Sequence, residues 1–363
     1  MLRFLRIYVL PGAILQSVNI AGGYGTGREL VEFFTRHGMG NGLAGMLVAT
    51  TLMSLIFALS LMIAQRYRVY DYRSFFKVLL GRAWFLFEML AVLLFILVLA
   101  VMGAAAGEIL SREFGLPRLA GGAALLVAVV VLNFFGRDWV TRVLAGWSVF
   151  LYLVFGAYFV SVLASSGPMR DGTFAWHLES AWAVSALQYA LYNVAGIPVI
   201  LYAARAIENG RQAVAAGVAG GLITMIPALM FHLSFAGAYP GIVTEQLPVY
   251  TMFERLSVPL LNTLYLVVLF GTFVETGAGN IQGLIERLDA WWQERRGATL
   301  SRGVHAGVAT VALVLASLLS AVGVVDLIAG GYGRIAWGYL VVFIVPLFTV
   351  GVYRLVQGRD SGP

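Results

Sequence analysis

The residues best suited to chemistry lie in two segments, and their chemistry is that of binding. Residues 21–29 read Ala-Gly-Gly-Tyr-Gly-Thr-Gly-Arg-Glu and interrupt an apolar stretch that runs from Ile7 to Phe34. Much later in the chain, Thr272, Glu275 and Thr276 are spaced at i, i+3 and i+4, so they share one face of a helix. Carbonyl, hydroxyl and carboxylate oxygens are the ligands that hard cations prefer. These residue types predict a site for an ion or a small polar solute.

Groups that would support catalysis are scarce in this chain. It contains no cysteine, and its four histidines are scattered, at His37, His177, His232 and His305. Neither a His-Glu-x-x-His metal motif nor a Gly-x-Ser-x-Gly nucleophile motif occurs, and there is no phosphate-binding loop. The sequence therefore argues against an enzyme and against direct use of nucleotides to drive pumping.

The elements that must position the two segments are membrane helices. Of the 363 residues 60% are hydrophobic and only 12% are charged, a composition typical of an integral membrane protein. Apolar stretches of about 20 residues or more predict helical spans. The ten predicted spans cover residues 5–35, 39–64, 83–110, 119–135, 139–164, 181–207, 212–239, 257–286, 303–322 and 332–354.

The positive charge of the chain follows this topology. The net charge is +6, and most Lys and Arg residues lie in segments that face one side if the N-terminus is cytoplasmic. The opposite side carries only Arg36, Arg112, Arg118, Arg170, Arg255 and Arg334. This bias predicts a multi-pass protein of the inner (plasma) membrane with both termini in the cytoplasm. Because the basic residues are explained by topology, we expect the lipid bilayer and not nucleic acid as a partner.

Two of the predicted spans are broken at corresponding places. Residues 21–27 interrupt the first span, and Asn193 to Pro198 interrupt the sixth. The ten spans divide into two sets of five with opposite orientation, 5–164 and 181–354, within a single domain of residues 1–363. Matching breaks in two halves are typical of transporters built from inverted repeats. The alternative is that the glycines form a helix-packing face and Pro198 a simple kink.

A broken helix offers backbone groups to a ligand. Non-helical backbone is tolerated in hydrocarbon only where protein, water or a ligand satisfies it. Exposed carbonyls can coordinate a cation, and the amides that begin the next half-helix favour an anionic group. Thr26 to Glu29 fits a capping box that restarts the first helix, and Pro198 suits the first turn of a restarted sixth helix.

The run Gly22 to Glu29, followed by Phe33 and Phe34, resembles the amino acid, polyamine and organocation transporter superfamily, whose LeuT-like fold is a five-plus-five inverted repeat. Within it the run looks closest to the bacterial YkvI-like branch. The resemblance implies alternating access, a substrate held between helices one, three, six and eight, and often sodium coupling. It also implies a sodium site made by carbonyls of the first break and hydroxyls of the eighth helix.

These arguments assign the candidate residues. For the substrate they are Gly23, Tyr24, Gly25, Thr26, Gly27, Tyr192, Asn193, Gly196 and Glu275; for the coupling ion they are Ala21, Tyr24, Thr272, Glu275 and Thr276; Arg28 is the predicted gate. Glu275 departs from the family's hydroxyls, and it could complete a cation site, pair with a substrate amine or carry a proton. The alternatives are an ion pair between Glu275 and Arg28, and threonine hydroxyls bonded to their own helix.

The expected function is symport of a small, amino-acid-like organic solute, driven by sodium or protons and without any other cofactor. The segment 241–259, called the outer segment below, is expected to form an external lid, since Pro248 and Pro259 bound an apolar run. A solute-binding membrane receptor of the same fold, without net transport, stays open as an alternative. The sequence gives no indication of the oligomeric state.

Overall fold

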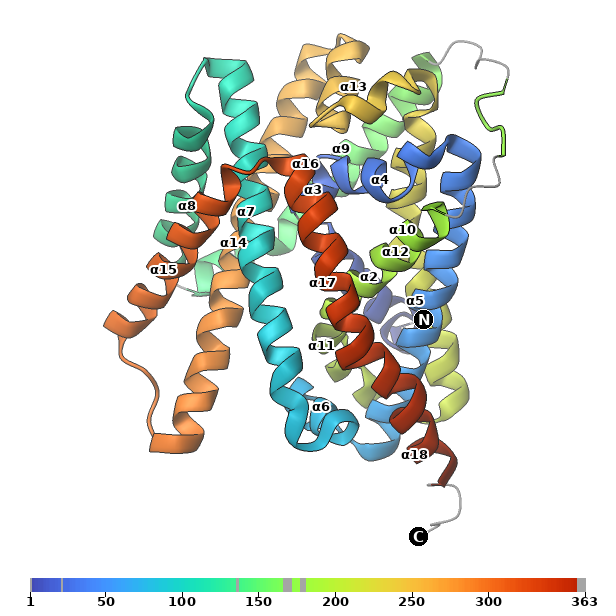
Figure 1. Ribbon diagram of the computed structural model, residues 1–363, viewed down its shortest axis with the longest axis vertical. Coiled ribbons are helices and arrows are strands. Elements are labelled where there is room, and N and C mark those ends of the chain that lie inside the picture. Colours follow the sequence, from blue (N-terminus) through green and yellow to red (C-terminus); the bar gives the residue numbers. More distant parts are fainter. Residues whose placement is uncertain (1, 21, 135–136, 166–171, 177–180, 358–363) are drawn as a thin grey trace.

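The computed structural model describes residues 2–20, 22–134, 137–165, 172–176 and 181–357. All regular structure within these residues is helical (Figure 1). The α-helices are α1 (Leu2–Phe4), α2 (Leu10–Asn19), α3 (Gly22–Gly25), α4 (Arg28–Phe33), α5 (Met39–Tyr67), α6 (Tyr72–Leu80), α7 (Phe85–Phe114), α8 (Arg118–Phe134), α9 (Arg137–Ser165), α10 (Ala181–Asn193), α11 (Ile197–Ile200), α12 (Gly210–Ser234), α13 (Pro248–Leu256), α14 (Pro259–Arg296), α15 (Arg302–Ser320), α16 (Val324–Asp326), α17 (Gly333–Tyr339) and α18 (Val352–Gln357). Short 3₁₀ and π-helical turns join many of them.

The helical segments agree with the predicted spans. Seven are long and apolar enough to cross a membrane, namely Met39–Tyr67, Tyr72–Phe114, Ala181–Ala206, Gly210–Ala238, Pro259–Arg296, Arg302–Ser320 and Val324–Gln357. Three shorter apolar helices are Leu5–Gln16, Arg118–Val131 and Phe150–Ser165. Each predicted span overlaps one of these segments, so the prediction of a helical membrane protein is confirmed. That all ten cross the bilayer, as two inverted repeats, stays a prediction.

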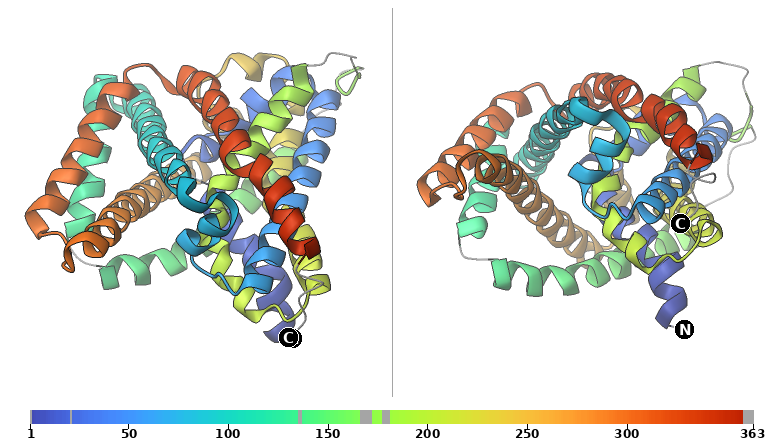
Figure 2. Two further views of the ribbon diagram at one scale, coloured as in Figure 1. Left: turned by 60° about the horizontal axis from the view of Figure 1, so that its bottom comes forward. Right: turned by 90° about the horizontal axis from the view of Figure 1, so that it is seen from below.

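Eight of the helices form two packed groups, which α3, α9 and α17 connect. One group consists of α2, α5, α10 and α12, and the other of α7, α8, α14 and α15 (Figure 1). Close approach within each group depends on glycine. In the first group Gly217 lies against the backbone of Ala58, and in the second Gly122 lies against the backbone of Gly103. The helix α9 packs against both α12 and α14, and Figure 2 shows it lying across one side of the molecule.

The first helix is broken between the two groups. The helix α2 ends at Asn19, and the next residue, Ile20, leaves the helical region at φ −74° and ψ 63°. After the short α3, Gly27 adopts a left-handed conformation with φ 78°, and α4 begins at Arg28. Helix α3 packs against α7 and α14, whereas α4 packs against α10 and α12. The predicted break is therefore present, and it lies against the third, sixth, seventh and eighth helices.

The sixth helix differs from the prediction of an unwound stretch. Between α10 and α11 the chain forms a 3₁₀ turn, Val194–Gly196, and every backbone angle given for it is right-handed helical. Pro198 lies in the first turn of α11, as predicted. A second 3₁₀ segment, Leu201–Ala206, ends at Ile207, where the chain becomes extended. The sixth helix is thus loosened rather than unwound, because Pro198 removes one backbone donor without forcing the chain out of helical geometry.

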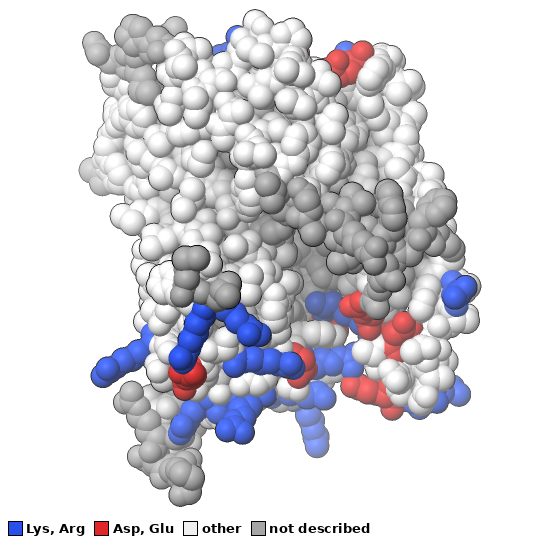
Figure 3. All heavy atoms as spheres, turned by 180° about the vertical axis from the view of Figure 1, so that it is seen from behind, with Lys and Arg blue, Asp and Glu red and all other residues white. Residues whose placement is uncertain are grey.

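Charged side chains gather at one end of the molecule. On the face seen in Figure 3, Lys and Arg cluster at the lower end, the end at which Figure 1 shows α6 and α18. Charged side chains are few on the rest of that face, as expected for a surface in contact with lipid. This distribution agrees with a positive-inside topology.

Because the two helix groups depend on close backbone contact, Gly217→Ala should destabilise the fold. A β-carbon there would lie 2.3 Å from the backbone nitrogen of Ala58, so α5 and α12 would have to separate. We expect a loss of about 1–3 kcal/mol in the free energy of unfolding, typical of overpacking. Thermal unfolding in detergent measures the change.

The matched control is Gly307→Ala in α15, where no atom lies within 4 Å of the new methyl group. In that helix the substitution should be neutral or stabilising by up to about 1 kcal/mol. Equal midpoints for the two variants would contradict the role given to Gly217.

Candidate functional site

The break in the first helix is closed by hydrogen bonds from its surroundings. Four of its carbonyl oxygens accept a bond: Gly23 from the Thr26 hydroxyl at 2.7 Å, Tyr24 from the Gly27 amide at 2.9 Å, Gly25 from the Tyr265 hydroxyl at 3.2 Å and Thr26 from the Val249 amide at 3.0 Å. Two of these donors belong to other elements, α14 and α13. In this state the carbonyls from Gly23 to Thr26 are satisfied by protein.

The capping box predicted for Thr26 and Glu29 is wrong in its bonding. The Arg28 amide donates to the Thr26 hydroxyl at 3.3 Å, but the residue that precedes α4 is Gly27, in left-handed geometry. The Glu29 carboxyl accepts bonds from the Tyr192 hydroxyl, at 2.5 Å, and from the Tyr24 backbone. The turn at Gly27 directs Glu29 into the protein, so its side chain does not cap the helix through Thr26.

Glu29 is the centre of a buried polar cluster that the sequence reasoning missed. It is only 4% exposed, and Gly23 leaves room for its carboxyl, since a β-carbon at Gly23 would lie 2.6 Å from a Glu29 oxygen. Four buried tyrosines lie around Glu29: Tyr192 and the Tyr24 backbone donate to its carboxyl, and the Tyr189 and Tyr332 rings pack against Tyr192. The available signal was an ionisable residue within an apolar span, which the capping pattern obscured.

Arg28, the predicted gate, is almost fully buried and ties α4 to the outer segment. Its guanidinium donates to the Val243 carbonyl at 2.8 Å and to the Glu245 carbonyl at 2.9 Å. It also pairs with Glu32 at 2.7 Å, one turn along the helix. The pairing of Arg28 with Glu32 is as expected from their i, i+4 spacing. The alternative ion pair between Arg28 and Glu275 is wrong, because Arg28 is engaged elsewhere.

The outer segment lies directly over the break. The Val249 amide bonds the Thr26 carbonyl, and a β-carbon at Gly27 would lie 2.7 Å from the Val249 side chain. At its far side the Tyr250 hydroxyl donates to Glu113, at the end of α7. Burial and this carboxylate raise the pKa of Tyr250 above its ordinary value. The position of the segment fits a lid, and its mobility stays a prediction.

The face predicted on the eighth helix is only partly directed at the break. The Thr272 hydroxyl donates to its own helix, at the Val268 carbonyl 2.8 Å away, and accepts from Trp147 at 3.4 Å. Back-bonding, the alternative considered for the threonines, is therefore realised at Thr272. The residue of α14 that touches a break carbonyl is Tyr265, two turns earlier, which the sequence reasoning did not single out.

Glu275 and Thr276 are half-buried on α14. Within the described parts of the chain, Glu275 has no ion pair or hydrogen bond. Gly271 and Gly279 share its face at i−4 and i+4; Gly271 lies against Trp147, and no atom lies near a β-carbon placed at Gly279. Glu275 thus lies on the flank of α14 between Trp147 and an open surface.

The remaining candidates are placed as follows. Asn193 is buried and donates to the Tyr189 carbonyl in its own helix at 2.8 Å. A β-carbon at Gly196 would lie 2.5 Å from the Leu15 side chain, so this glycine lets α2 approach the sixth helix. Ala21 lies outside the described residues. Among the residues that the structure describes, no group of three or more His, Cys, Asp or Glu side chains could hold a metal ion.

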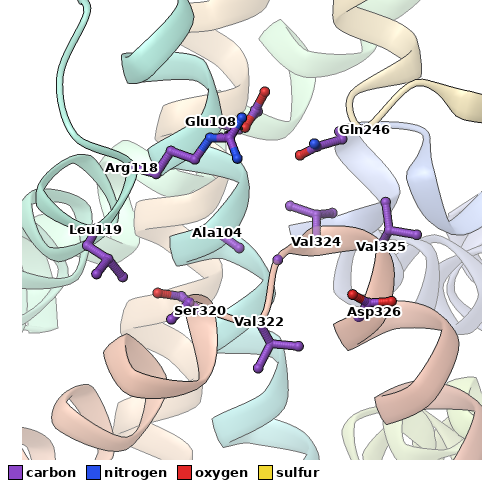
Figure 4. A pocket seen from close by; sticks show the side chains of 12 residues that line it. Ala104, Glu108, Arg118, Leu119, Gln246, Ser320, Val322, Val324, Val325 and Asp326 are labelled. Atoms are coloured by element: carbon purple, nitrogen blue, oxygen red, sulfur yellow. Dashed lines mark ion pairs between the residues drawn. The ribbon is translucent and has the colours of Figure 1, made fainter.

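A pocket of about 360 Å³ lies beside the outer segment, and α16, which lines it, packs against α4. Figure 4 shows it between α7, the start of α8 and the connection from α15 to α16. Polar side chains that line it include Glu108, Arg118, Gln246 and Asp326, and Glu108 is paired with Arg118 at 2.8 Å. None of the residues predicted for the substrate or the ion lines this pocket.

Comparisons with known proteins agree with this architecture. No family model matches the sequence. The chain is 23% identical over 339 residues to the uncharacterised membrane protein YkvI of Bacillus subtilis strain 168, which covers 91% of this chain and 88% of YkvI. The structure of this chain is similar to that of a substrate-bound, outward-open Na⁺-coupled sialic acid symporter. The TM-score is 0.61, with 10% identity, and the match covers 93% of this chain and 78% of the symporter.

A second similar structure is MhsT in complex with L-phenylalanine, with a TM-score of 0.57 and 16% identity over 93% of this chain and 87% of MhsT. At these identities the likeness shows the fold alone, which is the LeuT-like fold of these two transporters. The similarity in sequence to YkvI agrees with the predicted resemblance to the YkvI-like branch.

Proposed function

We propose that this chain is a secondary active symporter of a small, amino-acid-like organic solute, working by alternating access on a sodium or proton gradient. The observation that carries the proposal is the broken first helix, whose two parts α3 and α4 contact different helix groups, with the outer segment bonded to it. The LeuT-like fold supports it, since the similar structures include a Na⁺-coupled symporter and a protein with bound L-phenylalanine.

The proposal places the protein in the inner (plasma) membrane with both termini in the cytoplasm, supported by the clustering of Lys and Arg at one end. The substrate would lie at the break, among Gly23, Tyr24, Gly25, Thr26 and Gly27, and against Tyr192, Asn193 and Gly196 of the sixth helix. The coupling ion would lie toward Ala21, Thr272, Glu275 and Thr276. Arg28 would act as the outer gate.

Alternating access requires bonds that hold each side closed in turn. On the outer side, Arg28 donates to the Val243 and Glu245 carbonyls. On the predicted cytoplasmic side, Arg287 of α14 pairs with Glu88 of α7, and Arg73 of α6 donates to Glu294 at 2.6 Å. Opening either side must break the bonds on that side. Both sets lie between elements that would have to separate.

Ion and substrate should stabilise the purified protein in detergent. We expect the unfolding midpoint to rise in sodium relative to potassium, and to rise further with one class of amino acid. A ligand at ten times its dissociation constant adds about 1.4 kcal/mol, which a thermal scan can resolve. A solute response that depends on pH and ignores sodium would indicate proton coupling, and binding without concentrative uptake into vesicles would favour the receptor alternative.

Glu275→Gln should abolish ion-driven uptake while leaving the fold intact. Glu275 has no partner among the described residues, so the loss of its charge breaks no ion pair and should leave the fold intact. The same change removes the carboxylate that would bind the coupling ion within the membrane. Uptake into proteoliposomes under a sodium gradient, and then under a proton gradient, measures the effect. Uptake at the wild-type rate in this variant would remove Glu275 from the mechanism.

Arg28→Lys should loosen the outer segment, because a lysine cannot reproduce the forked contact of the guanidinium with two carbonyls. The chain has no cysteine, so a single Val249→Cys reports directly on access to the buried underside of the segment. We expect its maleimide labelling rate to rise by about tenfold or more when Arg28 is replaced, since a hydrogen bond from a charged group contributes about 1.5–3 kcal/mol.

The control for this experiment is Thr244→Cys, which is exposed in the same segment and should label at one rate in both backgrounds. If the labelling rate of the Val249→Cys variant is the same with and without Arg28→Lys, Arg28 does not hold the segment closed.

A further inference from the structure

The helix α6 lies at the charged end of the molecule and is held there by its apolar face (Figure 1). Phe76 stacks on Phe87 of α7, with 3.7 Å between the ring centroids, and contacts Phe343 at 5.0 Å. Its neighbour Phe75 also contacts Phe343, at 6.2 Å. All four side chains are buried. The other face of α6 is therefore fixed in position and directed away from the core.

Polar bonds attach the start of α6 to α7 and α14. The Tyr72 hydroxyl donates to Glu88 of α7 at 2.8 Å, and Arg73 donates to Glu294 of α14 at 2.6 Å. Arg287 of α14 pairs with Glu88 and accepts a bond from Arg73 at its carbonyl, at 3.3 Å. The two arginines on the inner side of α6 are thus balanced by carboxylates of the protein.

The cations on the outer side of α6 are not balanced in this way. Lys77 and Arg82 are exposed, and within the described parts of the chain neither side chain forms an ion pair or a hydrogen bond. The Lys77 ammonium lies 5.6 Å from the centre of the Trp84 ring, and the Arg73 guanidinium lies 5.2 Å from the same ring. Because Glu294 neutralises Arg73, the charge left without a partner beside Trp84 is that of Lys77.

Arg82 adds a second unbalanced charge to the same turn. It lies in the 3₁₀ segment Gly81–Trp84, which joins α6 to α7. Residues 72–87 contain no Asp or Glu, and the next acidic residue, Glu88, is already paired with Arg287. The turn between α6 and α7 therefore presents positive charge that only a group from outside the chain can balance.

Apolar side chains are exposed directly beside these cations. Phe85, Leu86 and Met89, in the first turns of α7, are all exposed. Trp84, whose ring contacts Lys77, separates them from the charged turn. Trp, Lys and Arg are the residues that anchor helices where hydrocarbon meets the lipid headgroups. Basic residues beside exposed apolar ones are typical of a segment that lies in this interface.

The two features together select the kind of anion. A soluble anion could balance Lys77 and Arg82, but it would leave the apolar surface uncovered. A phospholipid brings a phosphate, which both ammonium and guanidinium groups bind, and acyl chains that cover apolar side chains. A zwitterionic headgroup carries its own ammonium, which competes for the phosphate, whereas an anionic headgroup leaves the phosphate charge free. Anionic lipids are also the ones that basic segments attract at the cytoplasmic surface.

We propose that the turn between α6 and α7 binds an anionic phospholipid, with its phosphate at Lys77 and Arg82 and its acyl chains against Phe85, Leu86 and Met89. This site goes beyond the proposed function, since it requires neither a solute nor a coupling ion. It also differs from the general attraction of a basic surface for lipid, because the cations stand on a helix that is fixed by its packing. A lipid bound there would join α6 to α7 from outside and stabilise the protein.

The test uses full-length protein purified in detergent. Dioleoyl-phosphatidylglycerol and dioleoyl-phosphatidylcholine, which share their acyl chains, are added separately, and native mass spectrometry measures the fraction of protein that carries one lipid. We expect phosphatidylglycerol to bind about tenfold more tightly, because two cations face its phosphate. Phosphatidylglycerol should also raise the thermal unfolding midpoint, whereas inorganic phosphate at the same concentration should not.

Lys77→Gln combined with Arg82→Gln should abolish the preference for phosphatidylglycerol, because the change removes both charges at the turn. Neither side chain pairs with a carboxylate among the described residues, so the unfolding midpoint without lipid should stay at the wild-type value. Each single change should remove part of the preference, which keeps the proposal testable if the double variant does not fold. Lys77→Arg keeps the charge and should keep the preference.

The matched control for the single variants is Arg211→Gln, the same loss of charge at an exposed residue of α12 on the same predicted side of the membrane. It should leave the preference unchanged. An equal loss in this control would show that the lipid responds to the summed charge of the surface, which overturns the site. The proposal is also overturned if the wild-type protein binds both lipids equally, if the double variant keeps the preference, or if inorganic phosphate stabilises as much as phosphatidylglycerol.

Discussion

The structure around the first helix is governed by one constraint, the need to satisfy backbone polar groups where water is absent. Between Ile20 and Gly27 the helical ladder is interrupted, and the freed carbonyls must find donors elsewhere. Thr26 supplies one donor locally, while Tyr265 of α14 and the Val249 amide of α13 supply two from other elements. The break can exist only if α14 and the outer segment lie beside it. The positions of α14 and the outer segment therefore follow from the need to satisfy the backbone of the break.

The same bonds connect parts of the molecule that belong to different groups of helices. Tyr265 lies in the group with α7 and α8, whereas Tyr192, which bonds Glu29, lies in the group with α5 and α12. Any movement of one group relative to the other must exchange these bonds for others. Water or a solute would have to satisfy the released groups, because hydrocarbon cannot. The polar groups at the break are therefore sensitive both to a ligand and to the relative position of the two groups.

Sequence reasoning located what depends on local pattern. Apolar length predicted the spans, and glycine composition predicted the break at residues 21–27. It failed where the outcome depends on distant partners. Thr26 to Glu29 has the spacing of a capping box whether Glu29 turns back or bonds Tyr192, and the tyrosine is 163 residues away. Likewise no local rule tells whether Thr272 bonds an ion or the Val268 carbonyl, or whether Pro198 unwinds a helix or only loosens it.

Two buried or half-buried carboxyls lack a positive partner among the described residues. Glu29 is surrounded by aromatic rings at the break, and Glu275 lies on the flank of the eighth helix. Arg28, the neighbour of Glu29 in the chain, is held by Glu32 and by two carbonyls of the outer segment. A carboxyl buried without a positive partner carries its charge only at a high cost, and that cost falls when a proton or a cation binds to it. On the proposed function, the coupling ion would lower this cost at Glu275. An occupied ion site would then favour closure of the protein over the ion, which is the step that couples the ion gradient to transport.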